Sequence, residues 1–452
     1  MTQFQGLYRR SGMMRTAARL AAAGLVAAGA LSARAQTTAP ASEAPATAPA
    51  APSAPAPETP PPGLWINGIH LSAQFDAGFM GNPSGPADGL NFGHLFTDHA
   101  NQFQLNQVLL TANKPLDPKD PGYQWGFKVQ FMYGSDARYT QFLGELNRVN
   151  PNDRYQFDVV EANVLAHMPW LTEGGIDLKV GQYPTPLGYE TIDPSTNPFY
   201  SHSYIFQFGL PFKHTGGLAV THVNSMLDIY SGVDTGTNTT FGPLGENNGA
   251  IGGIAGFNLT LLDGQVTILA LTHMGPEQAT RVLSPAGFNA NGQWRFYNDV
   301  MVTWKATDAL TLVTEANLVR DGYGVANKPV NGFGIAQYGS YALTDTVALN
   351  GRVEYWRDDN NFFVASFPSN SGPVMAQQGF AVPFLHTAPG KNTTYGALTL
   401  GVTWKPALPA PVSGLLIRPE VRWDHAFTNN HPFNAQHDND AVTLGADAVI
   451  TF

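Results

Sequence analysis

The chain ends in Val442-Thr443-Leu444-Gly445-Ala446-Asp447-Ala448-Val449-Ile450-Thr451-Phe452. The even-numbered positions of this stretch are all apolar, and most positions between them are small or polar. A period of two residues is that of a β-strand, in which successive side chains point to opposite faces of the sheet. The stretch therefore predicts an amphipathic strand with one apolar face, and the terminal aromatic residue belongs to that face.

The same alternation recurs along most of the chain. Residues 417–423 (IRPEVRW) and 349–355 (LNGRVEY) place every charge on one face, and residues 125–133 and 398–404 show the same pattern. We predict sixteen strands, near 65–79, 102–113, 124–133, 156–168, 175–184, 215–223, 226–234, 251–262, 264–274, 294–305, 309–320, 331–342, 345–357, 393–405, 414–424 and 441–452. Seven short connections, such as Asp263-Gly264, alternate with eight longer polar segments. Short turns at one end and long loops at the other are typical of an even-stranded transmembrane barrel.

The amino-acid composition excludes a helical membrane protein, and its share of charged residues is lower than that of soluble proteins. Only 13% of the residues are charged, against about 25% in soluble domains. Yet the mean hydropathy is −0.14, and beyond the N-terminus no apolar run approaches the roughly 20 residues of a membrane helix. Alternation alone fits a soluble sandwich as well, because the pattern does not say which face meets the core.

The N-terminus predicts export. Residues 1–35 combine a basic start, a short apolar core at Leu20–Leu31 and an Ala-x-Ala cleavage pattern at 33–35, so we predict a signal peptide; translation could also begin at Met13 or Met14. Residues 36–62 are almost wholly Ala, Pro, Thr, Ser and Glu, a composition that cannot bury a core and predicts a disordered linker. Without the five arginines of the signal peptide, 19 basic residues face 34 acidic ones, a net charge of −15 that argues against nucleic-acid binding. The chain has no cysteine, so disulfides do not hold it together.

The predicted export, the unbroken series of strands and the final strand together indicate that residues 63–452 form a β-barrel in the bacterial outer membrane. An amphipathic strand ending at Phe452 resembles the C-terminal signal by which outer-membrane proteins are recognised for insertion. The expected partners are therefore the barrel-assembly machinery, outer-membrane lipid and lipopolysaccharide. Sixteen strands lie in the range that leaves an aqueous lumen, which predicts passage of small hydrophilic solutes.

The third long segment, 185–214, carries the candidate constriction. In general porins of sixteen strands the third outer loop folds into the barrel and narrows it. Here Glu190 and Asp193 lie among aromatic residues, of which Tyr189 is adjacent to Glu190. We expect these two carboxylates to face basic residues on the wall and to set up a transverse field. A packed loop that merely covers the barrel mouth is the alternative.

The barrel wall opposite these carboxylates is expected to carry charged residues that lie on the polar face of their strands. Arginine on the lipid face would cost about 2–4 kcal/mol at the membrane midplane, whereas charge inside a water-filled barrel costs little. The predicted wall residues are Lys128, Lys179, Arg295, Arg352, Glu354, Arg418, Glu420 and Arg422. They could equally pair across strands and hydrate the wall.

One stretch carries a resemblance to a known family. Residues 181–216 (GQYPTPLGYETIDPSTNPFYSHSYIFQFGLPFKHTG), with the strand FDVVEANV at 157–164, resemble the OmpL-like outer-membrane porins, the second group of β-barrel porins defined by sequence. The resemblance covers nearly all of the chain after the linker. It implies a barrel with porin activity and carries over no catalytic residues.

Other functions have weaker support in the sequence. The chain contains neither the Gly-x-Ser-x-Gly elbow nor the His-Glu-x-x-His motif, so we expect no enzyme; Ser203 between His202 and Tyr204 does not by itself make a hydrolase site. A plugged structural or adhesive barrel is a further alternative. His431, His437, Asp438 and Asp440 gather in the last loop, but we expect no specific metal site there and no cofactor. Analogy with general porins suggests a homotrimer.

Overall fold

The computed structural model of the chain describes residues 64–142, 145–146, 149, 154–240, 248–279, 289–325, 328–367, 385–390, 392–409 and 411–452. The predicted signal peptide and linker lie outside the described residues, and both stay predictions. Among the described residues, no helix has the length and apolar character needed to cross a membrane.

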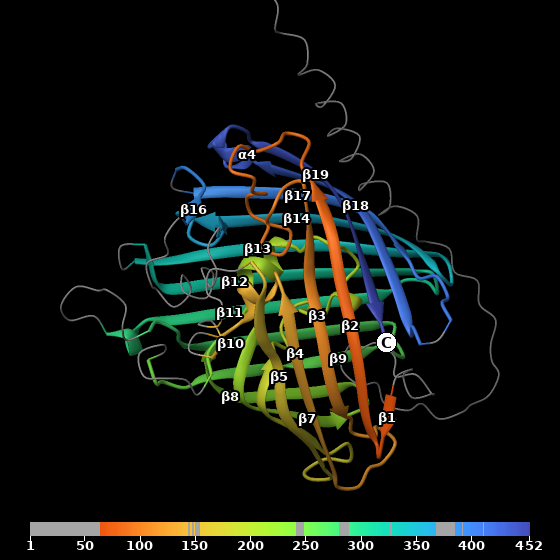
Figure 1. Cartoon of the computed structure of the whole chain (residues 1–452). Helices are drawn as coiled ribbons and strands as arrows, with labels where there is room; N and C mark the ends of the chain where they lie inside the picture. The colour runs from red at the N-terminus through yellow and green to blue at the C-terminus, as the bar shows by residue number, and fades with distance from the viewer. Residues whose placement is uncertain are drawn as a thin grey trace, which may run out of the picture. The chain divides into compact units, whose positions relative to one another are not determined.

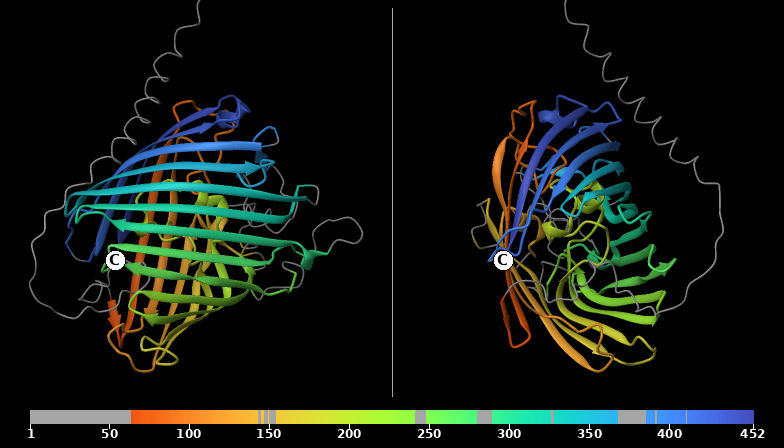
Figure 2. Two further views of the ribbon diagram at one scale, coloured as in Figure 1. Left: turned by 180° about the vertical axis from the view of Figure 1, so that it is seen from behind. Right: turned by 90° about the vertical axis from the view of Figure 1, so that its right-hand side faces the viewer.

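In the described part of the chain, sixteen antiparallel strands form one closed ring. They are β2 (Ile69–Gly81), β3 (Gln102–Lys114), β4 (Gln124–Gly134), β5 (Gln156–Met168), β6 (Ile176–Pro184), β7 (Lys213–Asn224), β8 (Leu227–Thr237), β9 (Gly252–Leu261), β10 (Val266–Pro276), β11 (Trp294–Lys305), β12 (Leu310–Val325), β13 (Lys328–Thr344), β14 (Val347–Asp359), β17 (Asn392–Trp404), β18 (Gly414–Ala426) and β19 (Asp440–Thr451). Each strand pairs with the next in this series, and β19 pairs with β2 to close the ring. Figures 1 and 2 show the strands following one another round the wall in chain order.

The wall is apolar on its outside and polar on its inside. On β14, Leu349, Val353 and Tyr355 are 44%, 45% and 43% exposed, whereas Arg352 and Glu354 between them are buried. Leaving a large apolar side chain in water forfeits about 1.5–3 kcal/mol, so a whole band of them requires a lipid environment. The alternation of the sequence is therefore that of a transmembrane barrel, and the choice between sandwich and barrel is settled.

The observed strands follow the predicted ones closely, with three differences. The first predicted strand, 65–79, is wrong as one element: a turn at Asn67 and Gly68, where φ is 50° and 80°, separates a short strand β1 (Leu64–Ile66) from β2, with which it pairs. β12 and β13 continue past their predicted outer ends, so the loop predicted at 321–330 is mostly strand. The predicted loop 358–392 contains a small two-stranded sheet of β15 (Ala365–Ser366) and β16 (His386–Thr387).

The long connections fold inward and build an apolar core inside the barrel. They carry the short helices α2 (Ala137–Thr140), η1 (Pro194–Thr196), η2 (Ile205–Gly209), η3 (Ala290–Gly292) and α4 (Phe433–Gln436). Phe96, from the connection after β2, packs its ring against Tyr139, Phe206 and Phe212, with centroids 5.4, 5.5 and 5.7 Å away. These side chains are buried in one cluster with Trp356 of the wall. Part of the lumen expected to hold water is thus filled by packed side chains.

Candidate functional site

The third long connection, residues 185–212, crosses the inside of the barrel, and we call it the inward loop. It starts from β6 and returns into β7, while its main contacts are on β14 and β18. β14 is eight strands away from β6 in the ring of sixteen, and therefore lies across the lumen from it. The last two residues predicted for this loop, Lys213 and His214, belong to β7.

Glu190 is the most heavily bonded side chain of the inward loop. Its Oε1 accepts hydrogen bonds from Arg352 Nη1 at 2.7 Å and from the Tyr338 hydroxyl at 3.1 Å. Its Oε2 accepts from the Ser203 N–H at 3.0 Å and lies 2.8 Å from His202 Nδ1. Burial alone would raise the pKa of Glu190, but the guanidinium of Arg352 and the bonds from His202 and Ser203 lower it to about 2. Glu190 is therefore a fixed anion at neutral pH.

The wall arginines hold the loop by its peptide carbonyls. Arg352 Nη1 donates to Ser201 O at 2.8 Å, and Arg422 Nη1 donates to His202 O at 2.7 Å. Arg418 Nη1 donates at 2.7 Å to the carbonyls of both Pro194 and Asn197. Irregular backbone inside a membrane protein needs such partners, because an unsatisfied peptide group there costs several kcal/mol.

The wall carboxylates hold the same segment by its peptide N–H groups. Tyr200 N–H donates to Glu420 Oε2 at 2.9 Å, and Tyr204 N–H donates to Glu354 Oε2 at 2.7 Å. The Tyr189 N–H donates to Glu315 Oε1 at 3.2 Å. Arginine side chains of the wall thus bind carbonyl groups of the loop, and wall glutamates bind its N–H groups. We call these contacts the backbone clamp.

The transverse field stays a prediction. Glu190 and the wall arginine Arg352 face each other in direct contact. Arg352 is also 2.8 Å from Glu354, Arg422 pairs with Asp424 at 2.8 Å, and Arg418 pairs with Asp447. Each of these arginines therefore has its charge balanced locally by at least one carboxylate.

Asp193 and Tyr189 have structural contacts of their own. Asp193 caps η1, because its Oδ1 accepts from the Ser195 N–H at 2.9 Å, and the same oxygen accepts from Gln74 of β2 at 2.8 Å. The Tyr189 ring packs on Tyr338 with centroids 4.6 Å apart. Burial, with the nearby carboxylates of Glu190 and Glu315, raises the pKa of Tyr189 to about 12.

The remaining predicted wall residues have contacts within the wall. Lys128 of β4 pairs with Glu161 at 2.5 Å, and Arg295 of β11 pairs with Asp321 at 2.5 Å. Lys179 of β6 lies 5.9 Å from the centroid of the Tyr183 ring. Lys128 and Arg295 therefore follow the alternative that these groups pair across strands, whereas the ring near Lys179 belongs to the same strand as Lys179.

The first two long connections, for which no role was predicted, support the inward loop. His94 Nε2 lies 3.1 Å from Asp424 Oδ2, and the Leu95 N–H donates to Gln207 Oε1 of the loop at 2.5 Å. Arg138 pairs with Asp98 at 3.0 Å; burial would raise the pKa of Asp98, but Arg138 holds it below its usual value. The apolar run LNFGHLF at 90–96 was the available signal, since exposed loops rarely carry such runs.

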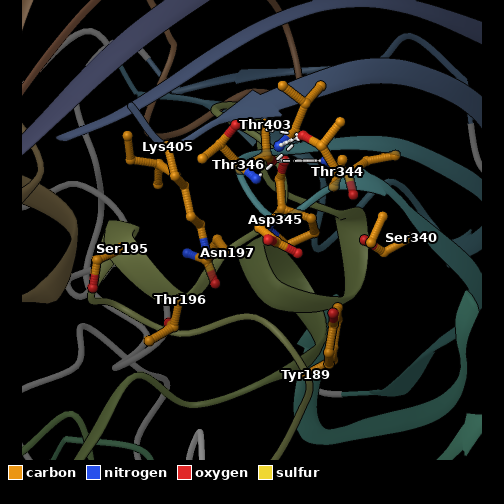
Figure 3. A pocket seen from close by; sticks show the side chains of 16 residues that line it. Tyr189, Ser195, Thr196, Asn197, Ser340, Thr344, Asp345, Thr346, Thr403 and Lys405 are labelled. Carbon is orange, nitrogen blue, oxygen red and sulfur yellow. Dashed lines mark hydrogen bonds between the residues drawn. The ribbon is translucent and has the colours of Figure 1, made fainter. Parts of the chain in front are cut away.

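A polar cavity lies between the inward loop and the short turn joining β13 and β14. Its volume is about 310 Å³. Most of its lining side chains carry hydroxyl or amide groups, and Lys405 and Asp345 add one charge of each sign (Figure 3). The lining consists of Tyr189, Ser195, Thr196, Asn197, Pro198, Ser340, Ala342, Thr344, Asp345, Thr346, Val347, Ala348, Asn350, Thr403, Lys405 and Leu416. η1 of the loop forms one of its walls.

The family model described as "Putative beta-barrel porin-2, OmpL-like" matches residues 68–452. The chain belongs to this porin family. This OmpL-like porin is accordingly an outer-membrane channel protein, and the resemblance, the location and the porin function expected from the sequence are confirmed.

Solved structures show the same fold at low sequence identity. Pseudomonas putida OprB, in its high-pH structure, is 12% identical, with a TM-score of 0.50 over 85% of this chain and 94% of OprB. Salmonella typhi OmpF, in a complex with daunomycin, is 8% identical, with a TM-score of 0.51 over 85% of this chain and 97% of OmpF. No curated protein sequence matches the OmpL-like porin. The solved structures support the sixteen-strand barrel.

Proposed function

We propose that this porin is a passive diffusion channel for small hydrophilic solutes and ions, and that the inward loop forms its constriction. The observation that carries the proposal is the backbone clamp, which fixes the loop across the lumen between β6 and β14. Tyr189 lines the polar cavity, and Asp193 caps η1, whose Ser195 and Thr196 line it. Solutes would pass from that cavity along the side of the loop.

The packed core inside the barrel supports a narrow path. Apolar side chains from several long connections occupy interior space that would otherwise hold water. The polar space near the loop includes a cavity of about 310 Å³, at the small end of ordinary ligand pockets, which span about 300–1,000 Å³. We therefore propose ions and small polar molecules as the solutes, and exclude large ones.

The net negative charge of the chain favours a channel that weakly prefers cations. The wall arginines are balanced by carboxylates, while the exported chain carries a predicted net charge of −15. An excess of negative charge near the mouths attracts cations, although screening limits this to about 10 Å in 0.1 M salt. The preference should therefore grow as salt is diluted.

Planar-bilayer recording tests this proposal. The double variant Glu190→Gln/Asp193→Asn is expected to shift the reversal potential in a salt gradient towards anions, because it removes two negative charges from the constriction. The matched control is Glu173→Gln/Asp308→Asn, which removes two exposed acids from the short turns. Strong anion selectivity of the unmodified porin would contradict the charge argument. Equal reversal potentials in the double variant and the unmodified porin would show that the loop does not line the path.

A plugged structural barrel is the second candidate, and the internal apolar core favours it. It predicts that the purified porin inserts into bilayers without stepwise conductance, whereas the channel predicts discrete steps. We propose no enzymatic activity. His202 turns its Nδ1 to Glu190, and the Ser203 hydroxyl accepts from the Phe206 N–H at 3.1 Å, so these two residues do not form a nucleophile–base pair.

We also propose a homotrimer, by analogy with general porins of sixteen strands. Aromatic side chains on the lipid face, such as Trp125 and Phe131 of β4, are exposed on the single barrel and could pack between barrels. Light scattering in mild detergent is expected to give the mass of three chains. The mass of one chain under conditions that preserve the fold would contradict the proposal.

A further inference from the structure

Three buried side chains converge at the outer ends of β7, β8 and β10. His214 Nδ1 lies 2.9 Å from Asp234 Oδ2, and His273 Nε2 lies 3.0 Å from the same oxygen. The three donor atoms all lie within 4.8 Å of one another, and both histidines have no exposed surface. Metal–ligand bonds of about 2 Å separate neighbouring donors by about 3 Å, so the spacing fits one shared ion.

Each imidazole has an oxygen near its outer nitrogen, the one that faces away from Asp234. His214 Nε2 lies 3.0 Å from the Thr185 hydroxyl, and His273 Nδ1 lies 3.9 Å from Glu277 Oε1. With protons on these outer nitrogens, the inner nitrogens can ligate a metal ion, and the Asp234 carboxylate is within reach of the same ion. A metal-ligating histidine commonly donates its other ring N–H to an oxygen, and the Thr185 hydroxyl offers such an oxygen to His214.

The local charge calls for a divalent cation. Asp234 and Glu277 are both buried carboxylates, and the two histidines are neutral as metal ligands. The nearby Arg295, which pairs in register with Gly275 of β10, is balanced by Asp321 at 2.5 Å. Asp234 therefore offers a negative ligand in a site without solvent, where a bound cation needs a nearby anion.

The backbone beside the cluster leaves space for the ligands. A Cβ at Gly252 would lie 2.6 Å from Asp234 Oδ1 and 2.8 Å from His273 Nε2. Any other residue at this position would push into both donors. Asp234 Oδ1 also accepts from the Gly236 N–H at 2.9 Å, which orients the carboxylate.

We propose that His214, Asp234 and His273 bind one divalent transition-metal ion, with Zn²⁺ the best match to two imidazoles and one carboxylate. Imidazole with carboxylate suits zinc and its neighbours better than calcium or magnesium. The ion ties three strands together beside the root of the inward loop. This proposal is independent of conduction. No metal site was predicted from the sequence, and in the last loop, where metal-ligating residue types gather, Asp440 contacts His425 at 2.8 Å.

Metal titration of the full-length refolded porin in detergent tests the site. After chelator treatment, Co²⁺ is expected to bind one ion per chain and to acquire the visible absorption of a low-symmetry nitrogen–oxygen site, which Zn²⁺ then abolishes. Asp234→Asn and His273→Gln should each weaken binding at least about 10-fold. His425→Gln is the matched control, because His425 also contacts an aspartate but on the opposite seam of the barrel.

The outcomes separate a metal site from a simple hydrogen-bonded triad. Thr185→Val keeps all three ligands and loses the outer hydroxyl; it should fold normally and bind Co²⁺ about 10-fold or more weakly, as outer-sphere partners do. Gly252→Ala should also weaken binding. Absence of Co²⁺ uptake by the folded porin would overturn the proposal, as would uptake that Asp234→Asn, Thr185→Val and Gly252→Ala all leave unchanged.

Discussion

Arg352→Met is expected to release the inward loop and to raise single-channel conductance. The substitution leaves Glu190 and Glu354 without their shared partner and removes the bond to Ser201 O. Breaking a buried ion pair by removing one partner costs about 3–5 kcal/mol, which is enough to detach a loop while a sixteen-strand wall stays intact. Conductance and liposome swelling with graded sugars measure the effect: larger sugars should enter faster.

Arg357→Met is the control for this experiment. Arg357 lies on the same strand, but its side chain is 37% exposed and its contact with Asp359 is 3.6 Å long, so its loss should change conductance little. The double variant Arg352→Met/Glu190→Gln should recover part of the lost stability, because it removes one of the stranded charges. Unchanged conductance and sugar cutoff in Arg352→Met would show that the clamp does not hold the loop.

Phe452→Asp, or deletion of Phe452, is expected to leave most of the protein in the periplasm. The Phe452 N–H donates to Ala73 O at 2.8 Å, and its ring packs edge-on against Phe75 with centroids 5.8 Å apart. Phe452 therefore joins the last strand, β19, to the first, β2, where the barrel closes. Its replacement or deletion weakens both the predicted assembly signal and the closure of the barrel. Membrane fractionation and heat-modifiable gel mobility report the outcome.

Phe427→Asp provides the comparison. Phe427 is an exposed aromatic residue at the outer end of β18, away from the seam, and its replacement should reduce outer-membrane levels far less. Normal levels of the Phe452 variants would mean that the ending plays no part in insertion.

The wall could be predicted from the sequence because each strand carries its own pattern. The strands predicted at 156–168 and 294–305 have those bounds in the structure. This alternation can be recognised without knowing which strands pair, because every strand has lipid on one face and the polar interior on the other. The turn at Asn67 and Gly68 was missed because it interrupts an alternation that continues beyond it.

The interior could be predicted only in part. Glu190 and Arg352 were both assigned to the lumen, but they are 162 positions apart, and local patterns do not say that they touch. The backbone clamp binds peptide groups, which every residue has. The side chains of the loop therefore give no signal from which the clamp could be predicted. Asp193 was predicted to act through its charge, yet Asp193-Pro194-Ser195 is also a helix-capping sequence, and capping is its main contact.

The backbone clamp has a consequence for the order of assembly. The inward loop leaves the ribosome between β6 and β7, whereas its partners Glu354, Glu420 and Arg422 follow some 150 to 220 positions later. Contacts between such distant positions form late, because a long chain segment must first be brought together. A newly inserted barrel should therefore pass through an interval in which its wall is complete and its loop is undocked. During that interval the membrane would be leakier than the mature protein allows, and the speed of docking would set how long the leak lasts.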